Sequence, residues 1–337
     1  MKKTQMKYAF PLKAGATLML ASIVAQPLTA VAADADAANF PGERPITLVV
    51  PYPPGGSNDT FARAVGMKLG TLLKTTVVIE NKGGAGGSIG TMQVARAKPD
   101  GYTLAAVSSS FTTNAAIQPS LPFDPIKDLR GVGLMAEGPF ILAVRKTLGI
   151  TKVADLIDYA KKNPEKLNYS SSGPGSSNQF ATEMLNSLAD IKMTHVPFKG
   201  MGPATNALIG DQVDVLIASG PSLLPAVGTG KATALGVTSS EKSQVAPDLP
   251  TIAADVPNYN FKIWWGILAP RGTPDAIVTK LNDALKTATS DPELKQFFLK
   301  EGAEAAYMTS ADFDKEISDN IALWKKVAKD QDIHVQK

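Results

Sequence analysis

The sequence contains no cysteine among its 337 residues and only two histidines, His195 and His334. The lack of cysteine excludes disulfides, thiolate metal sites and a cysteine nucleophile. Zinc and copper sites are built mainly from clustered His and Cys side chains, so two isolated histidines argue against them. We therefore expect neither a metal nor another cofactor.

Hydrolysis is the main catalytic alternative, and a Ser-His-Asp triad would have to use His195. This residue lies in the segment THVPF, whose composition is typical of a strand, where a histidine more often makes structural hydrogen bonds. His334 lies within the last four residues, where chains commonly fray. We expect a binding protein and not an enzyme, with a hydrolase or decarboxylase as the competing class.

Neither sign of charge dominates, since 34 basic residues stand against 31 acidic ones. The first 32 residues are typical of a cleavable signal peptide: a lysine-rich start, an uncharged apolar run at 14–25 and small residues at 30–32. That run is shorter than the roughly 20 residues that span a bilayer. Removing the leader removes four lysines and no acid, which leaves 30 basic against 31 acidic residues. The mature chain is therefore not expected to bind nucleic acid.

The rest of the chain alternates short apolar runs with amphipathic segments. Ile46–Tyr52 is almost wholly apolar, as in a strand buried on both faces, and Phe61, Val65, Leu69 and Leu72 then recur at helical spacing. Strands and helices that alternate in this way predict a parallel, doubly wound α/β sheet. A second alternation starts near residue 152 and ends near residue 238. Further strands are expected at 76–80, 102–107, 133–145, 167–171, 194–198, 212–218, 232–238 and 263–270.

Two loops of the first unit place glycine and serine directly before a helix: PYPPGGSND and NKGGAGGSIG. Helix N-termini carry unsatisfied N–H groups and partial positive charge, so such loops favour a small anion. The second loop resembles a nucleotide fingerprint, but Ala85 stands where the first glycine belongs. Ser88 is expected to cap the helix that follows. A tight turn without a ligand is the alternative reading of this loop.

The second unit repeats this arrangement with SSSGPGSSN, KGMGPA and a Ser219–Ser222 loop after successive strands. Because ligands bind beyond the carboxyl ends of parallel strands, we expect the loops of both units to line one carboxylate-binding cleft. The chain would cross between lobes near 138–143 and 260–266, with the terminal helices packed on the first lobe. The predicted boundaries are 1–32 for the signal peptide, 40–141 plus 263–337 for lobe 1 and 142–262 for lobe 2.

From about Pro45 to the C-terminus the chain resembles the substrate-binding receptors of tripartite tricarboxylate transporters, the Bug-type periplasmic proteins. The resemblance is carried, in order, by ITLVVPYPPGGSNDTFAR, VVIENKGGAGGSIGTMQVARAKPDGYTL, LPFDPIKDL, NYSSSGPGSSNQFATEML, THVPFKGMGPATNALIGDQVDV and WWGILAPRGTP. It implies a type II periplasmic-binding-protein fold, a Venus flytrap with two lobes and two crossover segments. It further implies a monomeric protein of the periplasm that delivers a small organic carboxylate, a di- or tricarboxylate or an aromatic acid, to membrane permease subunits.

The family holds its ligands largely through backbone amides, small hydroxyl groups and ordered water. Carried over by motif, the implied ligand-binding residues of lobe 1 are Pro54, Gly55, Gly56, Ser57, Asp59, Gly84, Gly86, Gly87, Ser88, Ser108, Ser109 and Phe111. Those of lobe 2 are Ser171, Gly173, Ser176, Ser177, Asn178, Lys199, Gly200, Gly202, Pro203 and Ser219. Phe111, Trp264 and Trp265 are expected either to face the ligand or to belong to the hinge core.

The chain departs from the family pattern in two places. Asn178 and Gln179 stand where members often carry a histidine, and Ser219 lies in the segment where many carry an aspartate. A ligand ammonium group needs an acceptor such as that aspartate, so we expect a carboxylate without an amino group. A sensing partner of a membrane kinase would use the same ligand site, so the sequence does not separate sensing from transport.

Overall fold

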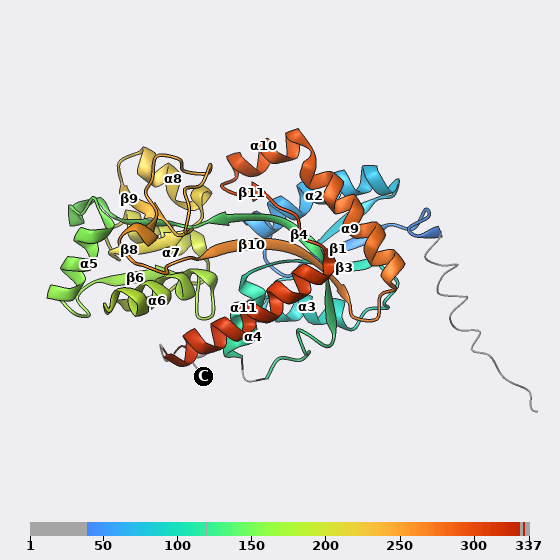
Figure 1. The fold of residues 1–337 in the computed structure, drawn as a ribbon, viewed down its shortest axis with the longest axis horizontal. Coiled ribbons are helices and arrows are strands. Elements are labelled where there is room, and N and C mark those ends of the chain that lie inside the picture. Colours follow the sequence, from blue (N-terminus) through green and yellow to red (C-terminus); the bar gives the residue numbers. More distant parts are fainter. Residues whose placement is uncertain (1–38, 119, 331–332, 334–337) are drawn as a thin grey trace, which may run out of the picture.

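The computed structural model describes residues 39–118, 120–330 and 333. The predicted signal peptide and His334 lie outside the described residues. Within them the chain forms two β-sheets flanked by helices, with long strands running between the two halves of the molecule (Figure 1). We call the half with the larger sheet lobe 1 and the other half lobe 2. None of the helices in this part of the chain is long and apolar enough to cross a membrane.

Lobe 1 contains a six-stranded sheet in the order β11-β4-β10-β3-β1-β2. The neighbours of β1 are parallel to it, whereas β10 is antiparallel to β3 and β4. Apolar side chains on both faces of this sheet are buried, because helices pack on both sides. The strands are β1 (Ile46–Val50), β2 (Val77–Asn81), β3 (Thr103–Ser108), β4 (Leu129–Pro139), β10 (Lys262–Pro270) and β11 (Glu304–Ala305).

Helix α2 connects β1 to β2 and confirms the predicted amphipathic segment. Phe61, Val65 and Leu69 are all buried on its inner face, whereas Leu72, in the last turn, is 42% exposed. Gly70 allows the chain to turn back closely, since a Cβ there would lie 2.9 Å from the carbonyl oxygen of Thr75. The helices of lobe 1 are α2 (Ser57–Leu73), η1 (Ala85–Gly87), α3 (Ser88–Ala95), α4 (Ser110–Ile117), α9 (Asp275–Ser290), α10 (Pro292–Lys300) and α11 (Ser310–Asp330).

Lobe 2 contains a five-stranded sheet in the order β7-β6-β8-β5-β9. β6 is parallel to β7 and β8, and β5 is antiparallel to β8 and β9. Its strands are β5 (Ile141–Arg145), β6 (Asn168–Ser171), β7 (Thr194–Pro197), β8 (Val215–Ala218) and β9 (Ala232–Val237). Its helices are η2 (Lys146–Leu148), α5 (Val153–Lys162), α6 (Ser177–Ala189), α7 (Met201–Ile209), α8 (Gly220–Gly228) and η3 (Ile252–Ala254).

Both sheets are mixed, which corrects the prediction of a purely parallel sheet. The parallel strands come from the local strand–helix alternation, as predicted. β5 instead follows β4 after the single residue Phe140, and β10 follows β9 and pairs in lobe 1. These strands arrive from the other lobe and not through a helix on the same sheet, so they run against their neighbours. The numerical lobe boundaries given above stay a prediction.

The last helix, α11, packs on lobe 1, as predicted for the terminal helices, and also reaches lobe 2. It contacts β4 and α4 and then extends to α6 of lobe 2 (Figure 1). On α11, Trp324 lies with its ring centroid 5.6 Å from that of Phe180 and 5.1 Å from that of Phe261. Phe313, Ile317, Ile321 and Trp324 recur at helical spacing in the sequence and are buried along this helix. Helix α11 therefore joins the lobes alongside the crossover strands.

The two tryptophans of β10 belong to the core. Trp264 and Trp265 are 3% and 1% exposed and pack edge-on against Phe313 and Phe61, with ring centroids 5.2 Å and 4.6 Å apart. These residues were expected either to face the ligand or to belong to the hinge core, and the structure places both tryptophans in the core.

Candidate ligand-binding cleft

A cleft of about 780 Å³ lies between the lobes. Its walls are the loop before α2, the end of β3 and the residue after α10 in lobe 1, and the starts of α7 and α8 in lobe 2. Half of the ligand residues implied by the sequence line this cleft: Pro54, Gly55, Gly56, Ser57, Ser108, Asn178, Lys199, Gly200, Gly202, Pro203 and Ser219. The structure thus brings loops of both units to one place.

Four helices, α2, α4, α7 and α8, begin at this cleft. Their N-cap residues are Gly56, Ser109, Gly200 and Ser219, and none of these side chains caps the helix by a hydrogen bond. Gly200 has φ +117°, a conformation that only glycine adopts without strain. No N-cap side chain therefore covers these helix N-termini, although the N–H groups of Thr112 and Ser222 bond to the carbonyls of Ser109 and Ser219 and Pro221 has no N–H. The four helix dipoles all favour an anion between them.

Charged side chains contribute little to the cleft. Within the described part of the chain, Lys199 and Glu301 are the only charged residues that line it, and Lys199 is exposed. Tyr52 adds a phenol: burial raises its pKa to about 12, although a hydrogen bond with Ser108 acts in the opposite direction. The phenol therefore stays protonated at neutral pH and can donate to a bound oxygen.

Asp59, which the sequence placed in the ligand set, is buried beneath the first loop and does not line the cleft. Its carboxylate accepts hydrogen bonds from the Gly55 N–H and the Asn81 side chain, both at 2.9 Å, and pairs with Arg63 at 2.9 Å. Burial alone would raise the pKa of Asp59, but these partners outweigh it and lower the pKa. Its visible role is to hold the loop that carries Gly55 and Gly56.

The second glycine loop lies apart from the cleft. Gly86, Gly87, Ser88 and Phe111 line a separate cavity of only about 10 Å³, which shares Tyr52 with the main cleft. The preceding Gly84 packs against the next helix, where a Cβ would lie 2.6 Å from Ile89. The sequence predicted that Ser88 caps α3. This prediction is wrong, because Gly87 occupies the N-cap position and Ser88 is the first residue of the helix. Contact between this loop and a ligand stays a prediction.

Several predicted serines contact one another across the lobes. Ser177 Oγ lies 3.0 Å from Ser109 Oγ and 3.1 Å from Ser110 Oγ, and Thr113 donates to the Gly175 carbonyl at 2.8 Å. These bonds join the start of α6 in lobe 2 to α4 in lobe 1. The lobes therefore touch on this side, and Ser109 and Ser177 are each 1% exposed.

The loop before α6 is held mainly by internal bonds. Ser176 caps α6 by accepting a hydrogen bond from the Gln179 N–H, and Gly173 bonds with Ser171. Asn178 lines the cleft while donating to the Ile217 carbonyl at 2.8 Å. Of the predicted ligand residues in this loop, Asn178 alone reaches the cleft surface.

His195 is a structural histidine, as the sequence predicted. Its Nε2 lies 2.6 Å from Ser171 Oγ, and its Nδ1 lies 3.4 Å from the Gln179 amide nitrogen. Because Nδ1 accepts from Gln179, Nε2 carries the proton and donates to Ser171, which is the reverse of a catalytic base. Residues 86–90 read Gly-x-Ser-x-Gly, the pattern of a hydrolase nucleophile. However, His195 is bonded to Ser171 and not to Ser88.

Burial lowers the pKa of His195 to about 4, which predicts a loss of stability in acid. An unfolded histidine, with a pKa of about 6.5, binds its proton first, so the unfolding free energy falls as the pH drops from 6.5 towards 4. The ring is half-buried, so we expect a loss of about 1–2 kcal/mol. Urea unfolding at pH 7 and pH 4.5 would measure it, and His195→Gln should be less sensitive by that amount. Equal pH dependence of both proteins would contradict the assignment.

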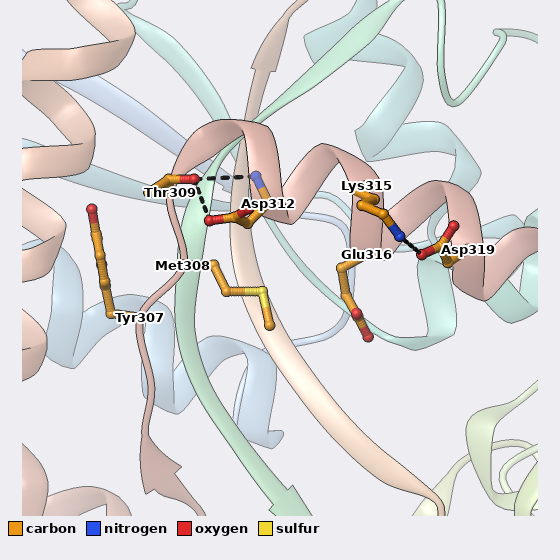
Figure 2. Close-up of a pocket in the computed structure, with 7 residues that line it drawn as sticks. All are labelled: Tyr307, Met308, Thr309, Asp312, Lys315, Glu316 and Asp319. Carbon is orange, nitrogen blue, oxygen red and sulfur yellow. Dashed lines mark hydrogen bonds and ion pairs between the residues drawn. The ribbon is translucent and has the colours of Figure 1, made fainter.

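A second hollow, of about 370 Å³, lies beside the start of α11 (Figure 2). Thr309 and Asp312 bond to each other across its first turn, and Lys315 pairs with Asp319. Its acidic side chains repel a carboxylate. Among the residues that the structure describes, no group of three or more His, Asp or Glu is placed to hold a metal ion. This hollow therefore does not compete with the cleft as a carboxylate site.

Several residues that line the cleft were not in the ligand set implied by the sequence, and the polar ones among them include Tyr52, Asn58, Thr205 and Glu301. Tyr52 and Asn58 both belong to the PYPPGGSND loop, but the resemblance assigned neither of them a role in ligand binding. Thr205 lies one turn into α7, beyond the glycine segment. Glu301 follows the C-terminus of α10 and belongs to no recognisable motif.

The two lobes, the crossover strands and the anion-favouring cleft define the class of solute-binding proteins. More particularly, residues 61–333 match the family model described as the tripartite tricarboxylate transporter family receptor, and the chain belongs to that family. This confirms the resemblance and, with the structural neighbours, the two-lobe fold.

Individual relatives agree with this assignment. Protein BugT of Bordetella pertussis is 32% identical over 303 residues, which are 89% of this chain and 93% of BugT. The structure of R. palustris Rpa4515 with adipate has a TM-score of 0.79 at 34% identity and covers 88% of this chain and 99% of that one. MatC from Rhodopseudomonas palustris with bound malate has a TM-score of 0.74 at 33% identity, with 86% and 99% covered. The two R. palustris structures hold adipate and malate, and this chain is a solute-binding protein of the same type and not an enzyme.

Proposed function

We propose that this protein captures a small organic carboxylate between its lobes in the periplasm and delivers it to a tripartite tricarboxylate-type permease. The observation that supports this most directly is the convergence of four helix N-termini from both lobes on one cleft. Such a site recognises an anion that touches both lobes at once. Its ligand therefore stabilises the closed arrangement by a hinge motion.

The energies fit a receptor without a strong charged anchor. A hydrogen bond to a charged group contributes about 1.5–3 kcal/mol net. Four or five such bonds, less the cost of ordering the ligand, reach the roughly 8 kcal/mol of micromolar binding. The uncapped helices, Tyr52 and the cleft serines offer at least that many donors.

The ligands of related proteins narrow the range of acids that should be tested first. Adipate in one neighbour and malate in another are both dicarboxylates. The periplasmic location rests on the predicted signal peptide and on the family, and the permease partner rests on the family alone.

A thermal-shift screen with aliphatic diacids, tricarboxylates and aromatic acids tests the proposal. An acid present at about 100 times its dissociation constant is expected to add about 2.7 kcal/mol of stability. Neutral amide analogues of the same acids serve as controls and should give no shift, because the helix N-termini favour a negative charge. A flat response to all three classes of acid would refute carboxylate binding.

A further inference from the structure

Two side chains at the cleft carry acceptor oxygens that have no hydrogen-bond partner in the described part of the chain. Asn58 Oδ1 is buried and has no hydrogen-bond partner among the residues that the structure describes. The half-buried carboxylate of Glu301 lines the same cleft and has no ion-pair or hydrogen-bond partner within those residues. Both groups accept hydrogen bonds at neutral pH, and the Glu301 carboxylate cannot donate.

Helix packing places these two acceptors on the same wall. The rings of Phe61 on α2 and Phe298 on α10 are in edge contact, with centroids 4.9 Å apart. Asn58 precedes Phe61 by one turn, and Glu301 follows Phe298 by one turn. Since both also line the cleft, they lie on the side of this contact that faces the ligand space.

Lobe 2 adds a group that bonds in either direction. Thr205 lines the cleft, and its Oγ1 is buried and likewise without a partner among the described residues. A buried acceptor left unpaired costs about 1–3 kcal/mol, so a ligand that supplies the missing donor gains a corresponding advantage. A deprotonated diacid offers only acceptors, and its charge is repelled by Glu301.

We propose, on the basis of the carboxylate function above, that the ligand carries a hydrogen-bond donor beside its carboxylate, either a hydroxyl or an ammonium group. The helix N-termini receive the carboxylate, and Asn58 and Glu301 receive the donor. This replaces the expectation of a ligand without an amino group. That expectation followed from the absence of an aspartate near Ser219, whereas Glu301 brings a carboxylate from lobe 1.

Matched acids test this selectivity in the unmodified protein. Calorimetry would compare succinate, malate and aspartate, and then glutarate, 2-hydroxyglutarate and glutamate, which differ only in bearing hydrogen, hydroxyl or ammonium at one carbon. We expect the hydroxy or amino acid to bind at least about tenfold more tightly than the plain diacid of the same length. Equal binding within each series would overturn this inference and leave carboxylate binding intact. Failure of every acid here and in the thermal screen would instead refute the proposed function, and the inference with it.

The variant Glu301→Gln separates the roles of charge and shape. It should reduce the preference for aspartate over succinate by about tenfold and the preference for malate by less, because glutamine keeps an acceptor but loses the charge. Glu241→Gln removes a charge at an exposed position outside the cleft and should leave both ratios unchanged. An unchanged aspartate-to-succinate ratio in a folded Glu301→Gln protein would contradict the role of Glu301. If that variant does not fold, the ratios in the unmodified protein still decide the proposal.

Discussion

Replacing Ser57 with aspartate is expected to weaken carboxylate binding by about 100-fold without destabilising the fold. Ser57 is the first residue of α2, lines the cleft and follows a glycine that provides no cap. A carboxylate introduced there would occupy the anion position and repel the ligand. Two like charges about 4 Å apart interact by about 4 kcal/mol at an effective dielectric constant of 20, before salt screening reduces the effect.

The Ser57→Asp substitution should raise the free energy of unfolding slightly while it lowers the affinity for the carboxylate. An acidic side chain in the first turn of a helix typically contributes about 0.3–1 kcal/mol through the helix dipole. Met67→Asp is the matched control, because it adds the same charge at a 73% exposed position on the same helix. Calorimetry and thermal unfolding of both variants would show whether only Ser57→Asp loses binding. Binding by Ser57→Asp at the original affinity would mean that the α2 N-terminus does not hold the carboxylate.

The local elements of this fold were predictable, whereas their pairing was not. Phe61, Val65 and Leu69 recur at helical spacing, and β1 is a continuous apolar run, so each element is encoded by adjacent residues. The direction of β10 depends on which lobe it leaves and which strands it meets. No local pattern carries that information, and the parallel sheet predicted from the alternation was therefore wrong for the crossover strands.

Helix α8 shows how tertiary packing overrides local signals. The sequence placed a loop at Ser219–Ser222, directly after the strand expected at 212–218. The structure instead begins a helix at Gly220, with Pro221 in the first turn, where the missing N–H costs nothing. Leu223 and Ala226 are buried on its inner face, and this burial outweighs the unfavourable Pro225 within the helix.

Residues of the candidate site were predictable where they lie in a loop that follows a strand and precedes a helix. Gly55, Gly56, Gly200 and Gly202 lie on the cleft for that reason. A serine in such a loop can equally face the opposite lobe, as Ser109 and Ser177 do across 68 residues of sequence. Glu301 reaches the cleft only because α10 packs on α2, and that contact has no signature in the sequence.

Gly302 provides the second test, which concerns how closely the lobes approach. This residue follows α10 in lobe 1 and has φ +72°, and a Cβ on it would lie 2.5 Å from Pro221 Cδ in lobe 2. Beside it, Glu304 accepts hydrogen bonds from Ser243 Oγ at 2.7 Å and from the Gln244 N–H at 3.2 Å. The two lobes therefore meet along a seam that has no room for a side chain at position 302.

Gly302→Val is expected to hold the lobes apart and to weaken carboxylate binding by about 10–100-fold. Overpacking of this kind costs about 1–3 kcal/mol, and opening the lobes relieves it, so the closed form loses population. Gly149→Val is the control: it has a similar φ of +73° but no atom within 4 Å of the added Cβ, so it tests backbone strain alone. Small-angle scattering at saturating ligand should give a larger radius of gyration for Gly302→Val than for Gly149→Val. Equal affinity and equal scattering of the two variants would show that this seam does not control closure.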